Sequence, residues 1–145
     1  MSLPPQLEEL VAAYDSIADR GERVALLIDT AGRFREVPPE VARRPFPEEN
    51  RVPNCESEAF VWALPDAGGA FALHFAVENP QGLSAKAMAV ILAETLAGAP
   101  LAELAELPDD LPYRIFGREL SLGKNMGLTG MVAMVRRAAR AAIRR

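Results

Sequence analysis

A run of prolines between residues 33 and 54 constrains the fold more than any other feature of the sequence. The prolines of this run are Pro38, Pro39, Pro45, Pro47 and Pro53. Proline lacks the backbone N–H that a helix interior and a central strand both need, so neither element can continue through this segment. The sequence therefore predicts a long loop over 33–54. Structureless stretches of about 20 residues are uncommon in compact domains and often carry function.

Two helices are predicted before this loop. Pro4 and Pro5 suit a first helical turn. Apolar residues then recur at helical spacing, at Leu7, Leu10, Val11, Tyr14 and Ile17. Asp19–Gly21 interrupts that pattern. The second helix is predicted to turn an apolar face inward and to end at Gly32, a usual C-terminal cap; that face comprises Val24, Leu27, Ile28 and Ala31.

An antiparallel hairpin is predicted after the loop. Over residues 56–64, Glu56, Glu58, Phe60, Trp62 and Leu64 alternate with Ser57, Ala59, Val61 and Ala63. A second alternating run places Phe71, Leu73, Phe75 and Val77 on one side and Ala70, Ala72, His74 and Ala76 on the other. Such alternation in aromatic and β-branched residues is typical of strands. Residues 65–69 between the runs form a turn.

Helical patterns return after the hairpin. Residues 81–97 are predicted to form a helix with Leu83, Ala87, Val90, Ile91 and Leu96 inward. A short helix follows from Pro100 to Glu106, then a turn over Pro108–Pro112 and a glycine-containing loop over Leu120–Met126. The last helix begins near Gly127, with an apolar stripe of Leu128, Met131, Val132, Val135, Ala139 and Ile143. This order predicts an α+β fold with helices packed on a small antiparallel sheet.

Composition narrows the chemistry further. The chain has 145 residues, which suits one domain over 1–145, with one cysteine and one histidine. One cysteine cannot form an internal disulfide or, with one histidine, a four-ligand zinc site, and it cannot hold an iron–sulfur cluster. We therefore expect no metal and no cofactor. A Ser-His-Asp triad would need His74, which we interpret as a structural or exposed residue.

Charge is unevenly distributed along the chain. Residues 1–110 carry 8 Lys+Arg against 19 Asp+Glu, whereas residues 111–145 carry 8 against 1. The basic end either contacts a charged partner or stabilises the C-terminus of a helix; its last arginines are Arg136, Arg137, Arg140, Arg144 and Arg145. The first ten residues do not resemble a signal peptide, and no apolar run reaches the ~20 residues of a membrane span. We expect a cytoplasmic protein that binds neither membrane nor nucleic acid.

Cys55 is the candidate for chemistry, because it ends the proline-rich loop and precedes the first strand. Loops on a rigid scaffold often carry function, although a free cysteine is more commonly a small buried apolar residue. The residues around it decide between the two. Arg51–Trp62, with the letters RVPNCESEAFVW, resembles the V-P-G-C-x-S-x-V-W signature of the SufE family. A late segment, Leu120–Leu128, is similar to the family's L-x-x-S-R-x-x-G-L.

The order of helix pair, loop, hairpin and helix also matches the family, so the resemblance covers about the whole chain. Some positions depart from it. Asn54 replaces the glycine before the cysteine, and asparagine tolerates a left-handed backbone better than most residues. Lys124 replaces the family's arginine and loses its planar fork. Glu78 is the nearest match to an acidic residue near the end of the second strand.

The resemblance implies a SufE/IscU-like fold and a protein that accepts sulfur from a cysteine desulfurase during iron–sulfur cluster assembly. Cys55 would be the sulfur acceptor. Residues that would support its loop or bind the partner are Arg51, Val52, Pro53, Asn54, Glu56, Ser57 and Lys124. The partners implied are a pyridoxal-phosphate-dependent, SufS-like desulfurase and an Fe–S scaffold protein. A homodimer is also implied.

The chain itself is not expected to be the desulfurase, since Schiff-base chemistry needs a lysine in a large cofactor fold and only Lys86 and Lys124 are present. If Glu56 and Glu58 point at the sulfur, they disfavour the thiolate, and Cys55 becomes nucleophilic only in the complex. Two other functions stay open. One is a binding module that uses the basic C-terminal helix. The other is a thiol-dependent hydrolase or peroxidase, which would ordinarily need a base or a second cysteine.

Overall fold

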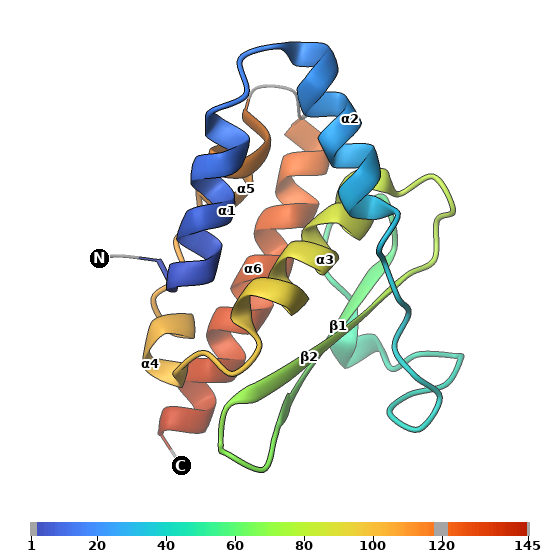
Figure 1. Ribbon diagram of the computed structural model, residues 1–145. Coiled ribbons are helices and arrows are strands. Elements are labelled where there is room, and N and C mark those ends of the chain that lie inside the picture. The colour runs from blue at the N-terminus through green and yellow to red at the C-terminus, as the bar shows by residue number, and fades with distance from the viewer. Residues whose placement is uncertain (1–2, 118–121, 145) are drawn as a thin grey trace.

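The computed structural model describes residues 3–117 and 122–144 and shows an α+β fold (Figure 1). The helices before the hairpin are α1 (Pro5–Asp15), α2 (Arg20–Ala31) and the single 3₁₀ turn η1 (Glu48–Asn50). Strands β1 (Ala59–Pro65) and β2 (Phe71–Val77) follow. The remaining helices are α3 (Leu83–Leu96), α4 (Leu101–Leu104), α5 (Leu111–Phe116) and α6 (Leu122–Ile143).

The two strands form the predicted antiparallel hairpin, with Val61 opposite Phe75 and Trp62 opposite His74. Directly opposed residues of an antiparallel pair share one face of the sheet. One face therefore presents Val61 and Phe75 to the main core, which α3 and α6 close from the other side. Figure 1 shows these helices lying on one side of the hairpin and the loop after α2 on the other.

The proline-rich loop covers the second face of the hairpin. Val37 donates its backbone N–H to Phe75 O at 2.8 Å, which fixes the loop along the outer edge of β2. Phe46 then packs its ring 5.2 Å from the ring of Phe60 and 5.1 Å from that of Trp62. The loop builds this second small core, so both faces of the two-stranded sheet are covered. The loop is therefore ordered by packing although its prolines exclude regular structure.

Two predictions about the helices were wrong. α6 begins at Leu122, so Leu122–Met126 is helical and not a loop; Leu120 and Ser121 of that prediction lie outside the described residues. Gly123 does not stop the helix, because one glycine costs a helix only about 1 kcal/mol relative to alanine. α5 was missed, since the prolines at 108 and 112 were interpreted as a turn, whereas Pro112 sits in the first turn of a helix, where proline is tolerated.

Some apolar stripes were also misplaced by part of a turn. Val24 and Ile28 of α2 are exposed, as are Leu83 at the start of α3 and Ile143 at the end of α6. The inward positions of α2 include Thr30, whose hydroxyl meets Tyr14 Oη at 2.7 Å. A polar residue satisfied inside the core shifts the buried face away from the purely apolar stripe. The rest of the α6 stripe, from Leu128 to Ala139, is buried as predicted.

Candidate functional site

The Cys55 loop is a short turn that the backbone closes at both ends. Val52 N–H donates to Ala59 O at 2.9 Å, and Glu58 N–H donates to Cys55 O at 3.1 Å. Asn54 has φ 56° and Glu58 has φ 52°, a left-handed conformation that most side chains avoid. Asn54, which stands where the signature has glycine, therefore adopts a backbone conformation that glycine also favours. The turn presents Cys55 half-buried at the point where the proline-rich loop enters β1.

The end of β2 holds the other side of this turn. Glu78 N–H donates to Glu58 O and Asn79 N–H donates to Ser57 O, each at 3.1 Å. Gly82 passes so close that a Cβ there would stand 2.9 Å from Ser57 Cβ. The Cys55 turn is therefore held by β1 on one side and by residues 78–82 on the other, so its conformation is restricted.

Two glycines of α6 form the surface on which the loop rests. A Cβ at Gly127 would stand 3.1 Å from both Cα and Sγ of Cys55, and one at Gly130 would stand 3.1 Å from Val52 Cγ1. Glycines three residues apart share one face of a helix. Together they make a notch that lets the cysteine backbone approach α6. Gly127 lies inside the late motif of the sequence, but its contact with Cys55 was not predicted, and Gly130 was missed.

A small hollow borders the sulfur. It is lined by the cysteine turn, by Ser84 and Ala85 of α3, and by Lys124, Gly127 and Leu128 of α6. It encloses about 10 Å³, at the lower bound of the roughly 10–15 Å³ that one water molecule needs. The hollow can hold one further atom beside the sulfur and is far too small for a substrate molecule.

The predicted loop residues fall into buried and exposed groups. Val52 is buried, Ser57 is half-buried, and Pro53, Asn54 and Glu56 are exposed. The structure brings Cys55, Glu56, Ser57 and Lys124 together around the hollow, which the sequence predicted only through the resemblance. Lys124 is exposed at the first turns of α6. Lys124 lines the hollow together with the cysteine turn, so its side chain lies near the thiol.

Arg51 supports the base of the loop without touching the hollow. Its guanidinium bonds Glu48 at 3.0 Å, lies 3.9 Å from Glu58, and stacks 4.7 Å above the Phe60 ring. These hydrogen bonds lower the pKa of Glu48 below its ordinary 4.5. Arg51 also occupies an isolated antiparallel bridge with Phe60. Glu58 is therefore directed toward Arg51, and this ion pair offsets its negative charge near the thiol.

Glu78, the predicted acidic match, joins a second ion-pair group. Arg44 of the proline-rich loop bonds both Glu36 and Glu78. These bonds lower the pKa of Glu36 and raise that of Arg44. The backbone of Glu78 also holds the Cys55 turn. The ion pairs of Arg44 with Glu36 and Glu78, here called the Arg44 latch, therefore connect the long loop to the site through the end of β2.

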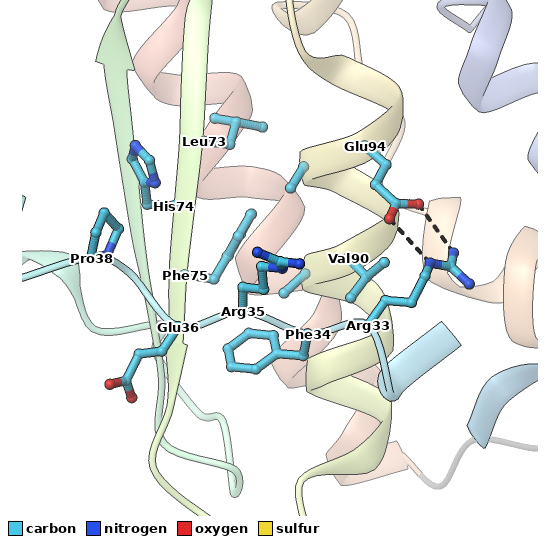
Figure 2. Close-up of a pocket in the computed structure, with 12 residues that line it drawn as sticks. Arg33, Phe34, Arg35, Glu36, Pro38, Leu73, His74, Phe75, Val90 and Glu94 are labelled. Carbon is cyan, nitrogen blue, oxygen red and sulfur yellow. Dashed lines mark hydrogen bonds and ion pairs between the residues drawn. The ribbon is translucent and has the colours of Figure 1, made fainter. Parts of the chain in front are cut away.

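Cavities far larger than this hollow lie elsewhere and are not lined by Cys55. One of about 530 Å³ is bounded by the 33–38 segment, β2 and α3, and Figure 2 shows Arg33 paired with Glu94 at its rim. His74 lines this cavity and not the hollow at Cys55. None of the described residues around the sulfur is therefore a histidine that could act as its general base. Within 3–117 and 122–144, no three His, Cys, Asp or Glu side chains are grouped to hold a metal ion.

The basic C-terminal helix is tied to the body of the protein. Arg136 Nη1 donates to Leu107 O at 2.9 Å and pairs with Asp109 at 2.7 Å. Arg140 Nε donates to Ala105 O at 2.9 Å. These carbonyls follow the short helix α4, whose C-terminal groups need partners. The two arginines thus bind backbone carbonyls of the protein itself, so fewer basic side chains of α6 are available to bind a charged ligand.

Comparison with protein families decides the class of the chain. The model of the SufE family, described as an Fe-S metabolism associated domain, matches residues 8–139. The chain belongs to the SufE family. A role in Fe–S metabolism follows from this membership, and with it the non-catalytic, sulfur-transfer class of protein. Arg51–Trp62, with Cys55 inside it, lies within the matched region.

A solved structure supports the fold independently. The chain is similar to the solution structure of a hypothetical protein from Thermus thermophilus, with a TM-score of 0.76 and 24% sequence identity. The similarity covers 99% of this chain and 100% of that one. A comparison with curated proteins finds no match. Across the described ranges, no helix is both long and apolar enough to cross a membrane.

Proposed function

We propose that the protein accepts sulfur from a cysteine desulfurase on Cys55 and passes it on for iron–sulfur cluster assembly. The observation that carries the proposal is the setting of Cys55, which lies at the tip of a braced turn, against a glycine notch, beside a hollow for about one atom. Membership of the SufE family supports the same role. Cys55 is also the only thiol of the chain, so a persulfide on it cannot be lost to an internal disulfide.

The proposed step is a displacement at sulfur. The Cys55 thiolate attacks the outer sulfur of a persulfide on the desulfurase cysteine, as in thiol–disulfide exchange. An Sγ–S bond forms on Cys55, the S–S bond of the desulfurase breaks, and its cysteine leaves as a thiolate. The outer sulfur keeps its proton and its oxidation state. The products are a Cys55 persulfide and a free desulfurase cysteine.

The residues around Cys55 supply charge and shelter. Lys124, beside the hollow, stabilises the attacking thiolate and later the persulfide anion, because a nearby cation favours the ionised form. The apolar side of the turn, with Val52 buried beneath it, keeps water away from the terminal sulfur. Arg51, Pro53, Asn54, Glu56 and Ser57 shape the turn or meet the partner. The proposal needs no resident cofactor or metal.

The partners follow from this chemistry. A pyridoxal-phosphate-dependent desulfurase donates the sulfur and an Fe–S scaffold protein receives it. The cytoplasm suits such a carrier, since a reducing compartment keeps its thiol free. A homodimer remains a prediction from the family, and sedimentation of the pure protein tests it.

Stimulation of the desulfurase tests the proposal. Alanine formation from cysteine is measured with the desulfurase alone, with the wild-type protein and with Cys55→Ser. Wild type should raise turnover and Cys55→Ser should not, because only a thiol can clear the persulfide from the desulfurase. Iodoacetamide labelling of Cys55 should also accelerate when desulfurase is added. Equal turnover with both variants would contradict the proposal.

A further inference from the structure

The two outer edges of the hairpin are covered unequally. At the edge of β1, Val52 N–H donates to the first residue of the strand at 2.9 Å, and Asn50 Nδ2 donates to Val61 O at 2.9 Å. At the edge of β2, the described residues supply one backbone bond, from Val37 N–H to Phe75 O at 2.8 Å. An uncovered edge presents backbone groups that can pair with another chain. The edge of β2 is therefore the open side of the sheet.

The backbone of Leu73 is unpaired at this edge. Opposed residues of an antiparallel pair alternate between those that exchange hydrogen bonds and those that turn their backbone groups outward. Because Phe75 O accepts a bond from outside the hairpin, Phe75 turns outward, and so does Leu73 two residues before it. None of the described residues bonds the N–H or O of Leu73 or the N–H of Phe75. Leu73 is only 8% exposed, and buried backbone groups are nearly always paired, so these groups are open to an outside partner.

A cavity lies beside this edge. Leu73 and Phe75 line it from β2, Val90 lines it from α3, and residues of the 33–38 segment bound it. We call this the β2 cavity. Its volume is about 530 Å³, which leaves room for apolar side chains of an incoming segment. Figure 2 shows the side chains of Leu73, Phe75 and Val90 around the same space.

Arg35 gives the β2 cavity a charge that the protein does not neutralise. Figure 2 shows its side chain between β2 and α3. The acidic lining residues are already paired, Glu94 with Arg33 at 3.1 Å and Glu36 with Arg44. Within the described part of the chain, the exposed guanidinium of Arg35 makes no hydrogen bond and no ion pair. A carboxylate is the group that complements this charge.

We infer that the edge of β2 receives an extended segment of another protein, which adds to the hairpin as a third strand. The segment pairs with the backbone of Leu73, places an apolar side chain in the β2 cavity and sets a carboxylate against Arg35. Leu73 offers a donor and an acceptor on the same edge, a pattern that a peptide backbone complements and a small anion does not. In such strand addition, main-chain bonds give affinity and side-chain pockets give specificity.

The site is separate from the sulfur chemistry. No described residue lines both the β2 cavity and the hollow at Cys55. A segment bound at the edge of β2 therefore leaves the thiol free to react. The inference does not depend on the proposed function, and either can fail alone.

Hydrogen exchange of the full chain, measured by NMR with short peptides, tests the inference. The probes are a set of acetylated and amidated hexapeptides of alternating valine and threonine, with a single aspartate moved through every position. At least one should bind saturably and slow exchange of the Leu73 amide by about tenfold or more. The His74 amide is the internal control, because its residue exchanges bonds with Trp62 of β1, and its exchange should change by no more than about twofold.

Two changes separate the strand from the charge. N-methylation of the peptide residue opposite Leu73 removes the N–H that Leu73 O would accept, and it should weaken binding about fivefold or more. Arg35→Glu should weaken binding of the aspartate peptide about threefold or more, and it should favour the same peptide with lysine in place of aspartate. Arg137→Glu is the matched control, because Arg137 is an exposed arginine that does not line the β2 cavity, and it should bind both peptides as wild type does.

Each outcome decides one part of the inference. If no peptide of the set slows exchange at Leu73, the edge of β2 is not a docking site. Binding that survives every N-methylation overturns strand addition, and equal effects of Arg35→Glu and Arg137→Glu overturn the carboxylate. Protection of the Leu73 amide that grows with protein concentration, without peptide, means that a second copy occupies the edge and overturns a separate partner. Melting temperatures of both variants, expected near wild type, exclude unfolding as the cause.

Discussion

At the scale of single residues, the approach of Cys55 to α6 depends on a missing side chain. Glycine in a helix interior costs about 1 kcal/mol relative to alanine, yet Gly127 lies within α6 against the cysteine. The close approach explains why this position is glycine. A side chain at position 127 must push the Cys55 turn outward, because the atoms it would meet include the Cα atom of Cys55 as well as its sulfur.

Gly127→Val should therefore raise the reactivity of the thiol. The valine displaces the turn, so the rate of iodoacetamide labelling of Cys55 should increase several-fold in the free protein, and unfolding should become easier by about 1–3 kcal/mol. Gly130→Ala is the comparison, because its methyl group would meet Val52 and the backbone oxygen of Pro53 and not Cys55, so it should raise the labelling rate less than Gly127→Val does. Labelling of Gly127→Val at the wild-type rate, with unchanged stability, would show that the notch does not position the thiol.

The sequence identified Cys55 but not the residues that seat it. The resemblance to a family signature named the cysteine turn and Lys124, and both border the hollow. The contact of Gly127 and Gly130 with the turn depends on how α6 crosses the hairpin, which no local pattern encodes. Their spacing of three was the available signal. The start of α6 was misplaced because Gly123 was assigned to a glycine-containing loop before the helix.

At the scale of elements, the basic helix has a structural task. Arg136 is 17% exposed at its side chain and bonds Leu107 O while pairing with Asp109. Arg136→Ala should destabilise the fold by about 1–3 kcal/mol, because it leaves a carbonyl after α4 without its charged donor. Urea unfolding measures this. Arg137→Ala, at an exposed neighbouring position, should change stability by less than about 0.5 kcal/mol. Equal losses of stability in the two variants would mean that the removal of positive charge, and not of the hydrogen bond to Leu107 O, causes the destabilisation.

The Arg44 latch predicts that the stability of the protein depends on pH. Arg44 lowers the pKa of Glu36 from its ordinary 4.5, so the ion pair contributes stability above that value. This contribution is lost as the pH falls through the lowered pKa, when Glu36 becomes protonated in the folded state. Wild type should lose more stability than Glu36→Gln between neutral pH and a pH well below 4.5. The difference is small, since both side chains are partly exposed.

Urea midpoints of the two proteins across this range measure the effect. Parallel curves for wild type and Glu36→Gln would contradict the contribution of the latch. The Glu40→Gln variant is a suitable control, because Glu40 is an exposed carboxylate of the same loop, and its removal should leave the acid limb of the curve as in wild type.

Elements with strict alternation were predicted best. The hairpin has a period of two on both strands, and each face meets its own core, so its type and sides were confirmed from Ala59 onward. The start of the first strand was predicted too early, since residues 56–58 belong to the turn that follows Cys55. The stripe of α2 failed because Thr30 takes an inward position by bonding Tyr14, a partner far away in sequence. Helix periodicity alone cannot show which part of an apolar face meets the core and which part stays exposed.

At the scale of the whole molecule, the α+β class followed from the order of periodic segments, which the structure confirms. The packing of the proline-rich loop did not follow, because its order comes from Phe46 packing against the rings of Phe60 and Trp62 in β1. That contact depends on a chain reversal that composition does not determine. The uneven charge was visible in the sequence, but the hydrogen bonds of Arg136 and Arg140 to the segment after α4 could be found only in the structure.

Intact mass measured after sulfur transfer tests the central claim most directly. Wild type and Cys55→Ser are each mixed with an active cognate cysteine desulfurase and cysteine, without reductant. Both variants should melt at similar temperatures, because Cys55 lies in a turn and is only half-buried. Wild type should gain the mass of one sulfur atom, which a reductant removes, and Cys55→Ser should gain none. The absence of added sulfur on wild type, or an equal gain on both proteins, would contradict the account.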